Sequence, residues 1–230
     1  MSKKVAVVTG ANKGIGLAVV RALCRAPFPG DVLLTARNEQ LGRAAVEQLR
    51  GEGLQAAFHQ LDICDQGSVK RLAAFLQDTY GGIDLLVNNA GIAFKSAACL
   101  APPRGAELKF CKYVLTCVLV AENAVEPFGE QAEVTMRTNF WGTLWVSQAL
   151  LPLLRPHARV VNISSFASQR ALGECSPELQ ANQRKGKSEG KRKSRVDRVI
   201  ELQEAPRSGG KVGGGLSLIR SALRIPPGLF

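Results

Sequence analysis

The sequence predicts an α/β fold built on a doubly wound parallel sheet, and three features support this prediction. Short apolar runs alternate with segments whose apolar residues recur at helical spacing. The first run, residues 5–8, is apolar throughout, as expected for a strand buried on both faces. It leads directly into a glycine-rich turn that opens a helical pattern. At 230 residues, the chain is long enough for one large domain of this class.

The glycine-rich turn is suited to binding phosphate. It reads T-G-A-N-K-G-I-G from Thr9 to Gly16. Gly10 can adopt backbone angles closed to other residues, Gly14 lets the main chain approach a pyrophosphate, and Gly16 lets the helix pack closely on the strand. The free N–H groups at the start of that helix present a positive dipole end to the ligand.

The other elements follow in order along the chain. Apolar runs bounded by turn residues predict further strands at 32–36, 55–60, 83–87 and 159–163. Helical spacing predicts helices at 16–25, 39–51, 65–79 and 131–154. The last helix is apolar on nearly its whole circumference, which is typical of a helix buried on most sides.

Several motifs recur in the order of a known family. After T-G-x-x-x-G-I-G come Asp62, Asn88-Asn89-Ala90-Gly91, Asn139 and Ser164-Ser165. This array resembles the short-chain dehydrogenase/reductase family, and within it the NADPH-dependent carbonyl reductases. The resemblance covers residues 3–95 and 120 to about 180. It implies a Rossmann-type fold and hydride transfer from NADPH to ketones, aldehydes or quinones.

The resemblance also implies which residues bind the cofactor. Arg37 ends the second strand and Lys13 lies in the glycine turn, and positive charge at these positions favours NADP(H) over NAD, because NADP carries a 2′-phosphate. Asp62 matches a position that contacts the adenine, and Asn89 one near the ribose. Two alternatives stay open, since Arg37 could be a solvated loop charge and Asp62 a turn residue. The full predicted set is Gly10, Asn12, Lys13, Gly14, Ile15, Gly16, Arg37, Asp62, Asn89 and Gly91.

Two predicted catalytic residues, Ser165 and Asn139, come from the same resemblance. The serine would bond the substrate carbonyl oxygen, and Asn139 would hold a helix bulge and a water in the proton path. The family then requires Tyr-x-x-x-Lys, in which the tyrosine protonates the carbonyl. The only tyrosines, Tyr80 and Tyr113, precede the serine, and neither has a lysine four residues later. We therefore expect an impaired reductase.

Two stretches depart from the family pattern. Residues 96–119 look inserted, either as a substrate-gating lid or as a splicing or gene-model product. Residues 182–230 are basic and glycine-rich, so we expect a mostly disordered tail behind a dinucleotide-binding domain at 1–181. The sheet would then be incomplete at its C-terminal end. Residues 160–163 would form an unpaired edge, and the helix around Trp141 and Trp145 would be left open to a partner or to aggregation.

The charge and the cysteines bear on partners and location. The net charge is +11, but residues 183–230 hold twelve Lys or Arg against four Asp or Glu, so the basicity belongs to the tail. A nuclear-import or RNA-binding patch there is the alternative to a solvated tail. The six cysteines form no C-x-x-C pair, and we expect free thiols, no metal site, no membrane span and a cytoplasmic chain. The alternative functions are a cofactor-binding pseudoenzyme, a partner-binding chain and nucleic-acid contact through the tail.

Overall fold

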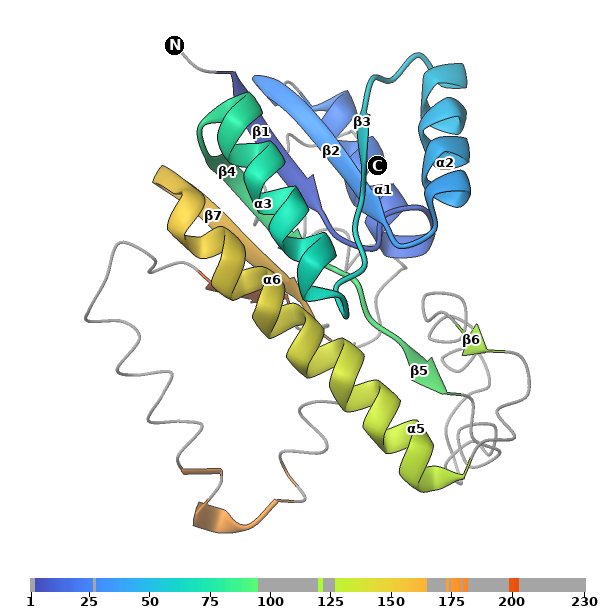
Figure 1. The fold of residues 1–230 in the computed structure, drawn as a ribbon, viewed down its shortest axis with the longest axis vertical. Coiled ribbons are helices and arrows are strands. Elements are labelled where there is room, and N and C mark those ends of the chain that lie inside the picture. Colours follow the sequence, from blue (N-terminus) through green and yellow to red (C-terminus); the bar gives the residue numbers. More distant parts are fainter. Residues whose placement is uncertain are drawn as a thin grey trace, which may run out of the picture.

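The computed structural model describes residues 3–26, 28–94, 120–121, 127–164, 173, 175–178, 180–181 and 199–202. Its centre is a six-stranded sheet in the order β3-β2-β1-β4-β7-β8, and every neighbouring pair of strands is parallel (Figure 1). The predicted doubly wound sheet is therefore confirmed. From β1 the strands are added outward through β2 to β3, and the chain then crosses back so that β4 lies on the other side of β1. Open α/β sheets bind ligands at the point where the strand order reverses in this way.

The first half of the molecule alternates strictly between strand and helix. Its elements are β1 (Lys4–Val8), α1 (Gly14–Arg25), β2 (Gly30–Ala36), α2 (Glu39–Gly51), β3 (Ala57–Gln60), α3 (Gln66–Tyr80) and β4 (Ile83–Asn88). Two short polar side chains start helices: Asn38 Oδ1 accepts a hydrogen bond from Leu41 N at 2.9 Å, and Asp65 Oδ1 accepts one from Gly67 N at 2.8 Å.

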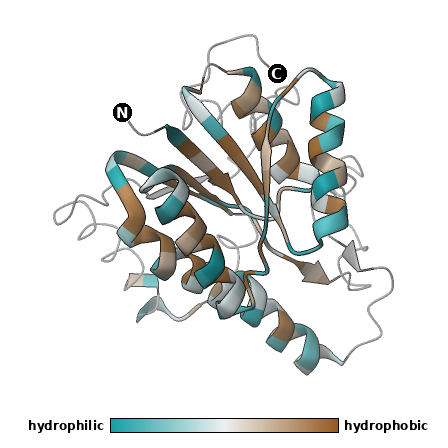
Figure 2. Ribbon diagram, turned by 45° about the horizontal axis from the view of Figure 1, so that its top comes forward, coloured by the Kyte–Doolittle hydropathy of each residue, from teal (hydrophilic) through white to brown (hydrophobic). Residues whose placement is uncertain are grey.

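Two apolar cores lie on opposite faces of the sheet. Because side chains alternate along a strand, β1 contributes Ala6 and Val8 to one core and Val5 and Val7 to the other. The first core is covered by α1 and α2, and the second by α3 and α6. Figure 2 shows the hydrophobic colouring concentrated along the strands and on the helix sides that face them.

The second half begins with one continuous helical rod. It consists of α5 (Phe128–Thr135), the π-helix η2 (Met136–Gly142), α6 (Thr143–Leu150) and the 3-10 turn η3 (Leu151–Leu153), after which the chain enters β7 (Leu154–Ile163). The predicted helix at 131–154 is confirmed, and the helix bulge expected around Asn139 is the π-helix. The expectation that this helix is buried on most sides is wrong in its first half, because Trp141 is 46% exposed.

The edge of the sheet differs from the prediction. Residues 160–163 of β7 pair in parallel with β8 (Val199–Leu202), so the expected unpaired edge is wrong. The sequence V-I-E-L has the β-branched composition of a strand, but it lies within a basic stretch whose composition predicts disorder. The rest of the tail after residue 181 lies outside the described residues.

The predicted insert at 96–119 also lies outside the described residues, but its flanks do not. β5 (Ala93–Phe94) pairs in parallel with β6 (Val120–Ala121) in a separate two-stranded sheet. The two ends of the inserted stretch are therefore held side by side. Over the described ranges, every helix is too short or too polar to cross a membrane.

Candidate cofactor site

The glycine turn follows β1 at the carboxyl edge of the sheet. Gly10 and Gly14 have φ angles of 61° and 59°, in the left-handed region that residues with a Cβ rarely adopt. The backbone of Lys13 is extended, and α1 begins at the next residue. The turn therefore brings the start of a helix to the end of the strand, as a phosphate-binding turn requires.

A reciprocal set of hydrogen bonds fastens this turn to the loop after β4. Asn89 Nδ2 donates to the carbonyl oxygens of Thr9 and Gly10, both at 2.9 Å. In return, Thr9 Oγ1 accepts hydrogen bonds from the backbone N–H groups of Asn89 and Ala90 at 3.0 Å. These four bonds join chain segments 80 residues apart, and we call them the Thr9–Asn89 clamp.

The clamp leaves no room for a side chain at Gly10 or Gly16. A Cβ on Gly10 would lie 2.7 Å from Ala90 Cα, and a Cβ on Gly16 would lie 2.5 Å from Asn89 Nδ2 and 2.7 Å from Gly10 O. Gly16 thus allows α1 to approach the clamp itself, in addition to the strand contact that the sequence predicts.

Asn139 holds the other side of the same loop. Its Oδ1 accepts a hydrogen bond from Ile92 N, and its Nδ2 donates to Ile92 O, both at 2.8 Å. A Cβ on Gly91 would lie 3.3 Å from Asn139 Oδ1, so the small residue permits this approach. The loop after β4 is therefore fixed by an asparagine at each end, Asn89 to the glycine turn and Asn139 to η2.

Two basic side chains lie at the same edge of the sheet. Ala11 N donates to Thr35 O at 2.8 Å, which attaches the glycine turn to the end of β2, two residues before Arg37. Lys13 and Arg37 are both exposed, and neither forms an ion pair within the part of the chain that the structure describes. Their charges are therefore available to an anion.

Asp62 lies further along this edge, after β3. Its Oδ1 accepts a hydrogen bond from Cys64 N at 2.9 Å, and its backbone N–H donates to Ser68 Oγ at 3.0 Å. One carboxylate oxygen of Asp62 thus stabilises a local turn, as expected if Asp62 is a turn residue. Of the remaining predicted residues, Asn12 is half-buried in the turn and Ile15 packs against the first core.

The predicted catalytic serine, Ser165, lies outside the described residues, directly after Ser164 at the end of β7. Polar side chains join the end of β4 to β7 and to α6: Asn88 Nδ2 donates to Asn162 Oδ1 at 2.8 Å and to Ser147 Oγ at 3.3 Å. Asn88 Oδ1 is buried without a hydrogen-bond partner among the described residues.

Two groups at this site were not among the predicted site residues. The Thr9 hydroxyl organises the clamp, and the backbone of Ile92 donates one hydrogen bond to the Asn139 side chain and accepts another from it. Thr9 belongs to the T-G-x-x-x-G-I-G motif, so its presence there was the available signal. The role of Ile92 is carried by its backbone, which leaves no mark on the sequence.

This fold and site are those of a Rossmann-type α/β domain with a glycine-rich turn at the carboxyl edge of its sheet. Residues 4–109 match the family model described as short chain dehydrogenase. Among curated proteins, the chain is 53% identical over 179 residues to carbonyl reductase (NADPH) 1 of Bos taurus and 54% identical over 176 residues to that of Homo sapiens, covering 78% and 76% of this chain. The chain belongs to the short-chain dehydrogenase/reductase family, close to these carbonyl reductases.

The relatives are longer than the matched region. The chain spans about half their length, 55% of the Bos taurus protein and 54% of the Homo sapiens protein. A solved structure of a metagenomic short-chain oxidoreductase in complex with NADP superposes with a TM-score of 0.61 at 23% identity, over 97% of this chain and 90% of that one. This likeness confirms the fold.

Proposed function

We propose that this chain binds NADP(H) at the carboxyl edge of β1, β2 and β4. The observation that carries the proposal is the Thr9–Asn89 clamp, because it holds the glycine turn and the start of α1 rigidly in one place. The N–H groups of that helix start would receive the pyrophosphate. The names of the carbonyl reductase relatives, which print NADPH, support the same cofactor.

The choice of NADP(H) over NAD(H) rests on two side chains. Lys13 and Arg37 lie beside the glycine turn and the end of β2, where the adenine ribose of a bound dinucleotide would lie. Each charge-assisted bond to the 2′-phosphate is worth about 1.5–3 kcal/mol. Asp62 would contact the adenine, and Asn89 and Gly91 would line the ribose side of the cleft.

The reaction class that we propose is reduction of a small carbonyl compound, strongly impaired in this chain. Two hydrogen bonds to Ile92 hold the Asn139 side chain, which supports a role for it in the proton path, and Ser165 would bond the substrate oxygen. The residues after Ser165 include no tyrosine, so the usual proton donor is missing. Cofactor binding without efficient turnover is therefore the function that the site supports best.

The test is a titration of the chain with NADPH and NADH, followed by nicotinamide fluorescence. We expect NADPH to bind more tightly, and Arg37→Asp to weaken its binding by roughly 10- to 150-fold with little effect on NADH. Arg50→Asp makes the same change of charge at the far end of α2 and should leave both affinities unchanged. Equal affinity of the unmutated chain for the two cofactors would contradict the proposal.

A further inference from the structure

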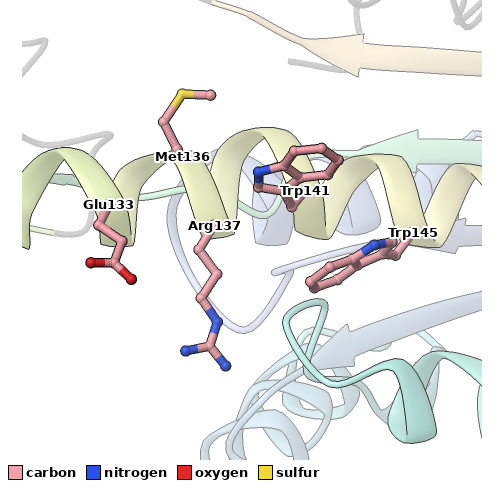
Figure 3. Close-up of a pocket in the computed structure, with 5 residues that line it drawn as sticks. All are labelled: Glu133, Met136, Arg137, Trp141 and Trp145. Carbon is pink, nitrogen blue, oxygen red and sulfur yellow. The ribbon is translucent and has the colours of Figure 1, made fainter.

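The rod formed by α5, η2 and α6 carries a large apolar surface. Val134, Met136, Phe140 and Trp141 are each 43–52% exposed, and Phe140 and Trp141 stack edge to face with ring centroids 4.9 Å apart. We call these four residues the outer helix patch. Beside them is an open hollow of about 500 Å³ (Figure 3), whose lining residues are Glu133, Met136, Arg137, Trp141 and Trp145.

The outer helix patch is unusual for this molecule. Among the described residues, the only other large apolar side chain as exposed is Leu41, which is isolated on α2. Scattered exposed apolar residues are normal in proteins, but a contiguous group beside a hollow marks a surface that another element covers. The patch is also separate from the candidate cofactor site, because none of its side chains belongs to the glycine turn or the Thr9–Asn89 clamp.

Residues 216–225, which lie outside the described residues, have the sequence of an amphipathic helix. They read L-S-L-I-R-S-A-L-R-I. At 3.6 residues per turn, all six apolar residues fall within an arc of about 180°, and the four polar residues fall together on the opposite side. Three glycines precede the segment and two prolines follow it, as expected for the bounds of a helix.

The connection to this segment is long enough to reach the patch. Leu202 of β8 pairs with Ile163 at the carboxyl edge of the sheet, and η2 is bonded at the same edge through Asn139 and Ile92. Residues 203–215 link β8 to the segment. Fully extended they span roughly 45 Å, and as a flexible coil about 20 Å on average, which is about the length of a 14-residue helix, so elements at this edge of the sheet lie within reach.

The charges of the two surfaces are complementary. Glu130 and Glu133 are exposed one turn apart on α5. Arg220 and Arg224 are likewise one turn apart in the segment, and no Asp or Glu follows Glu204 in the sequence. Arg137 also lines the hollow and would repel these arginines. The favourable placement therefore has the arginines at the α5 end of the patch.

We propose that residues 216–225 fold as an amphipathic helix on the outer helix patch of the same chain. Its apolar arc covers Met136, Phe140 and Trp141, and its arginines face the two glutamates of α5. Tethering by a short linker gives a local concentration on the order of 1 mM, so a contact that would be weak between separate molecules is populated within one chain.

The two tryptophans of the chain allow a direct test, because Trp141 and Trp145 both line the hollow. Acrylamide quenching of their fluorescence reports how well the patch is covered. We expect Ile219→Asp with Leu223→Asp to raise the quenching constant about twofold or more. Ser217→Asp with Ser221→Asp adds the same charge at the same spacing on the polar side and should leave the constant unchanged.

Three outcomes would overturn the proposal. They are equal quenching in both double variants, full exposure of the tryptophans in the unmutated chain, and protection that disappears on dilution, which would show a second copy on the patch. A charge exchange gives independent support: Glu130→Arg with Glu133→Arg should expose the tryptophans, and adding Arg220→Glu with Arg224→Glu should restore protection. If protection is not restored, the arginines do not face the two glutamates, and the proposed placement of the segment is wrong.

Discussion

Residues 3–94 and residues 127–164 cover their apolar surfaces in different ways. In the first region, α1, α2 and α3 each lay one apolar face on the sheet, and among the described residues there the only large apolar side chain left exposed is Leu41. In the second, α6 buries Val146 and Leu150, whereas η2 leaves Phe140 and Trp141 about half exposed. The same helical rod therefore passes from fully covered to uncovered within three turns.

The reason is geometric. In the first region each helix follows a strand and packs back on the sheet that the strand has just extended, so neighbouring residues in sequence supply the cover. The α5–η2 part of the rod projects beyond the sheet (Figure 1), and its cover has to come from a distant part of the chain or from another molecule. The first region thus supplies its own cover except where α6 packs on the second core, whereas α5 and η2 depend on something further along.

The largest expected effect concerns catalysis. We propose that the first region holds the cofactor, whereas the expected position of the proton donor follows Ser165, beyond both regions, and the residues after Ser165 include no tyrosine. Losing a positioned general acid costs about 100- to 10,000-fold in rate. We expect ketone reduction with NADPH to be lower by that factor than in an intact carbonyl reductase assayed alongside, while NADPH binding is retained. Comparable turnover, in a preparation free of host enzymes, would show that another group supplies the proton.

A second prediction concerns the polar link between the two regions. Arg155 Nη1 donates to Asp84 Oδ2 at 2.7 Å and to Lys3 O at 3.1 Å, and Nη2 donates to Tyr80 O. The side chains of Arg155 and Asp84 are only 16% and 17% exposed. Replacing Arg155 with Met leaves a partly buried carboxylate unpaired, which should lower the free energy of unfolding by about 3 kcal/mol.

The matched control for that change is Arg50→Met. Arg50 pairs with Glu47 on the surface of α2, where the two side chains are 71% and 62% exposed. Pairs of this kind contribute about 0–1 kcal/mol, so urea unfolding should show almost no change. Similar losses of unfolding free energy in the two variants would mean that the Arg155 hydrogen bonds contribute no more to stability than a surface ion pair.

One substitution at two glycines compares the regions directly. A methyl group on Gly16 would lie within 2.8 Å of Ala11 Cα and closer still to two other atoms, so Gly16→Ala should cost about 2 kcal/mol and weaken NADPH binding. In α5, Gly129 has no atom within 4 Å of that position. Gly129→Ala should therefore stabilise the chain by about 0.4–1 kcal/mol. Thermal unfolding measures both changes, and a destabilised Gly129→Ala chain would show that this face of α5 is covered.

The smallest effect is a pH dependence confined to the first region. The pKa of Tyr80 is raised to about 12, chiefly by burial and then by the hydrogen bond that its hydroxyl donates to Asp31 at 3.0 Å. Because the folded pKa lies above the unfolded value of about 10, the contribution to stability is complete below pH 10 and is lost as the pH rises towards 12. We expect a loss of about 1 kcal/mol over this interval, and a smaller loss in Tyr80→Phe. An unchanged slope in that variant would assign the titration to other groups.

Much of the first region could be predicted from the sequence because its signals are local. Apolar runs gave β1 and β4 to within a residue, and the glycine turn was placed correctly at Gly10 and Gly14. Membership of the glycine motif was the only sequence signal for Thr9, and the role of Ile92 could not be predicted, since both roles depend on chain segments that meet only in the folded chain. The π-helix came from the family resemblance, because its apolar spacing differs little from that of an ordinary helix.

The second region was harder to predict. β7 begins five residues earlier than expected, and its register against β4 shifts between Ile83 and Leu85, where Arg155 bonds Asp84. β8 was missed because four apolar or acidic residues carry little weight inside a basic stretch. Ser165, the cytoplasmic location and an origin as a splice variant stay predictions.

The short pairing of β5 with β6 has a consequence for how the length of this chain can vary. Because Ala93–Phe94 and Val120–Ala121 are bonded to each other, residues 95–119 begin and end at nearly the same point. The entropy of closing such a loop grows only with the logarithm of its length, and doubling it costs about 0.6 kcal/mol. Segments of very different size can therefore be added or removed at this position while the parallel sheet keeps the same register. A gene that gained or lost coding sequence at this point would disturb the fold very little.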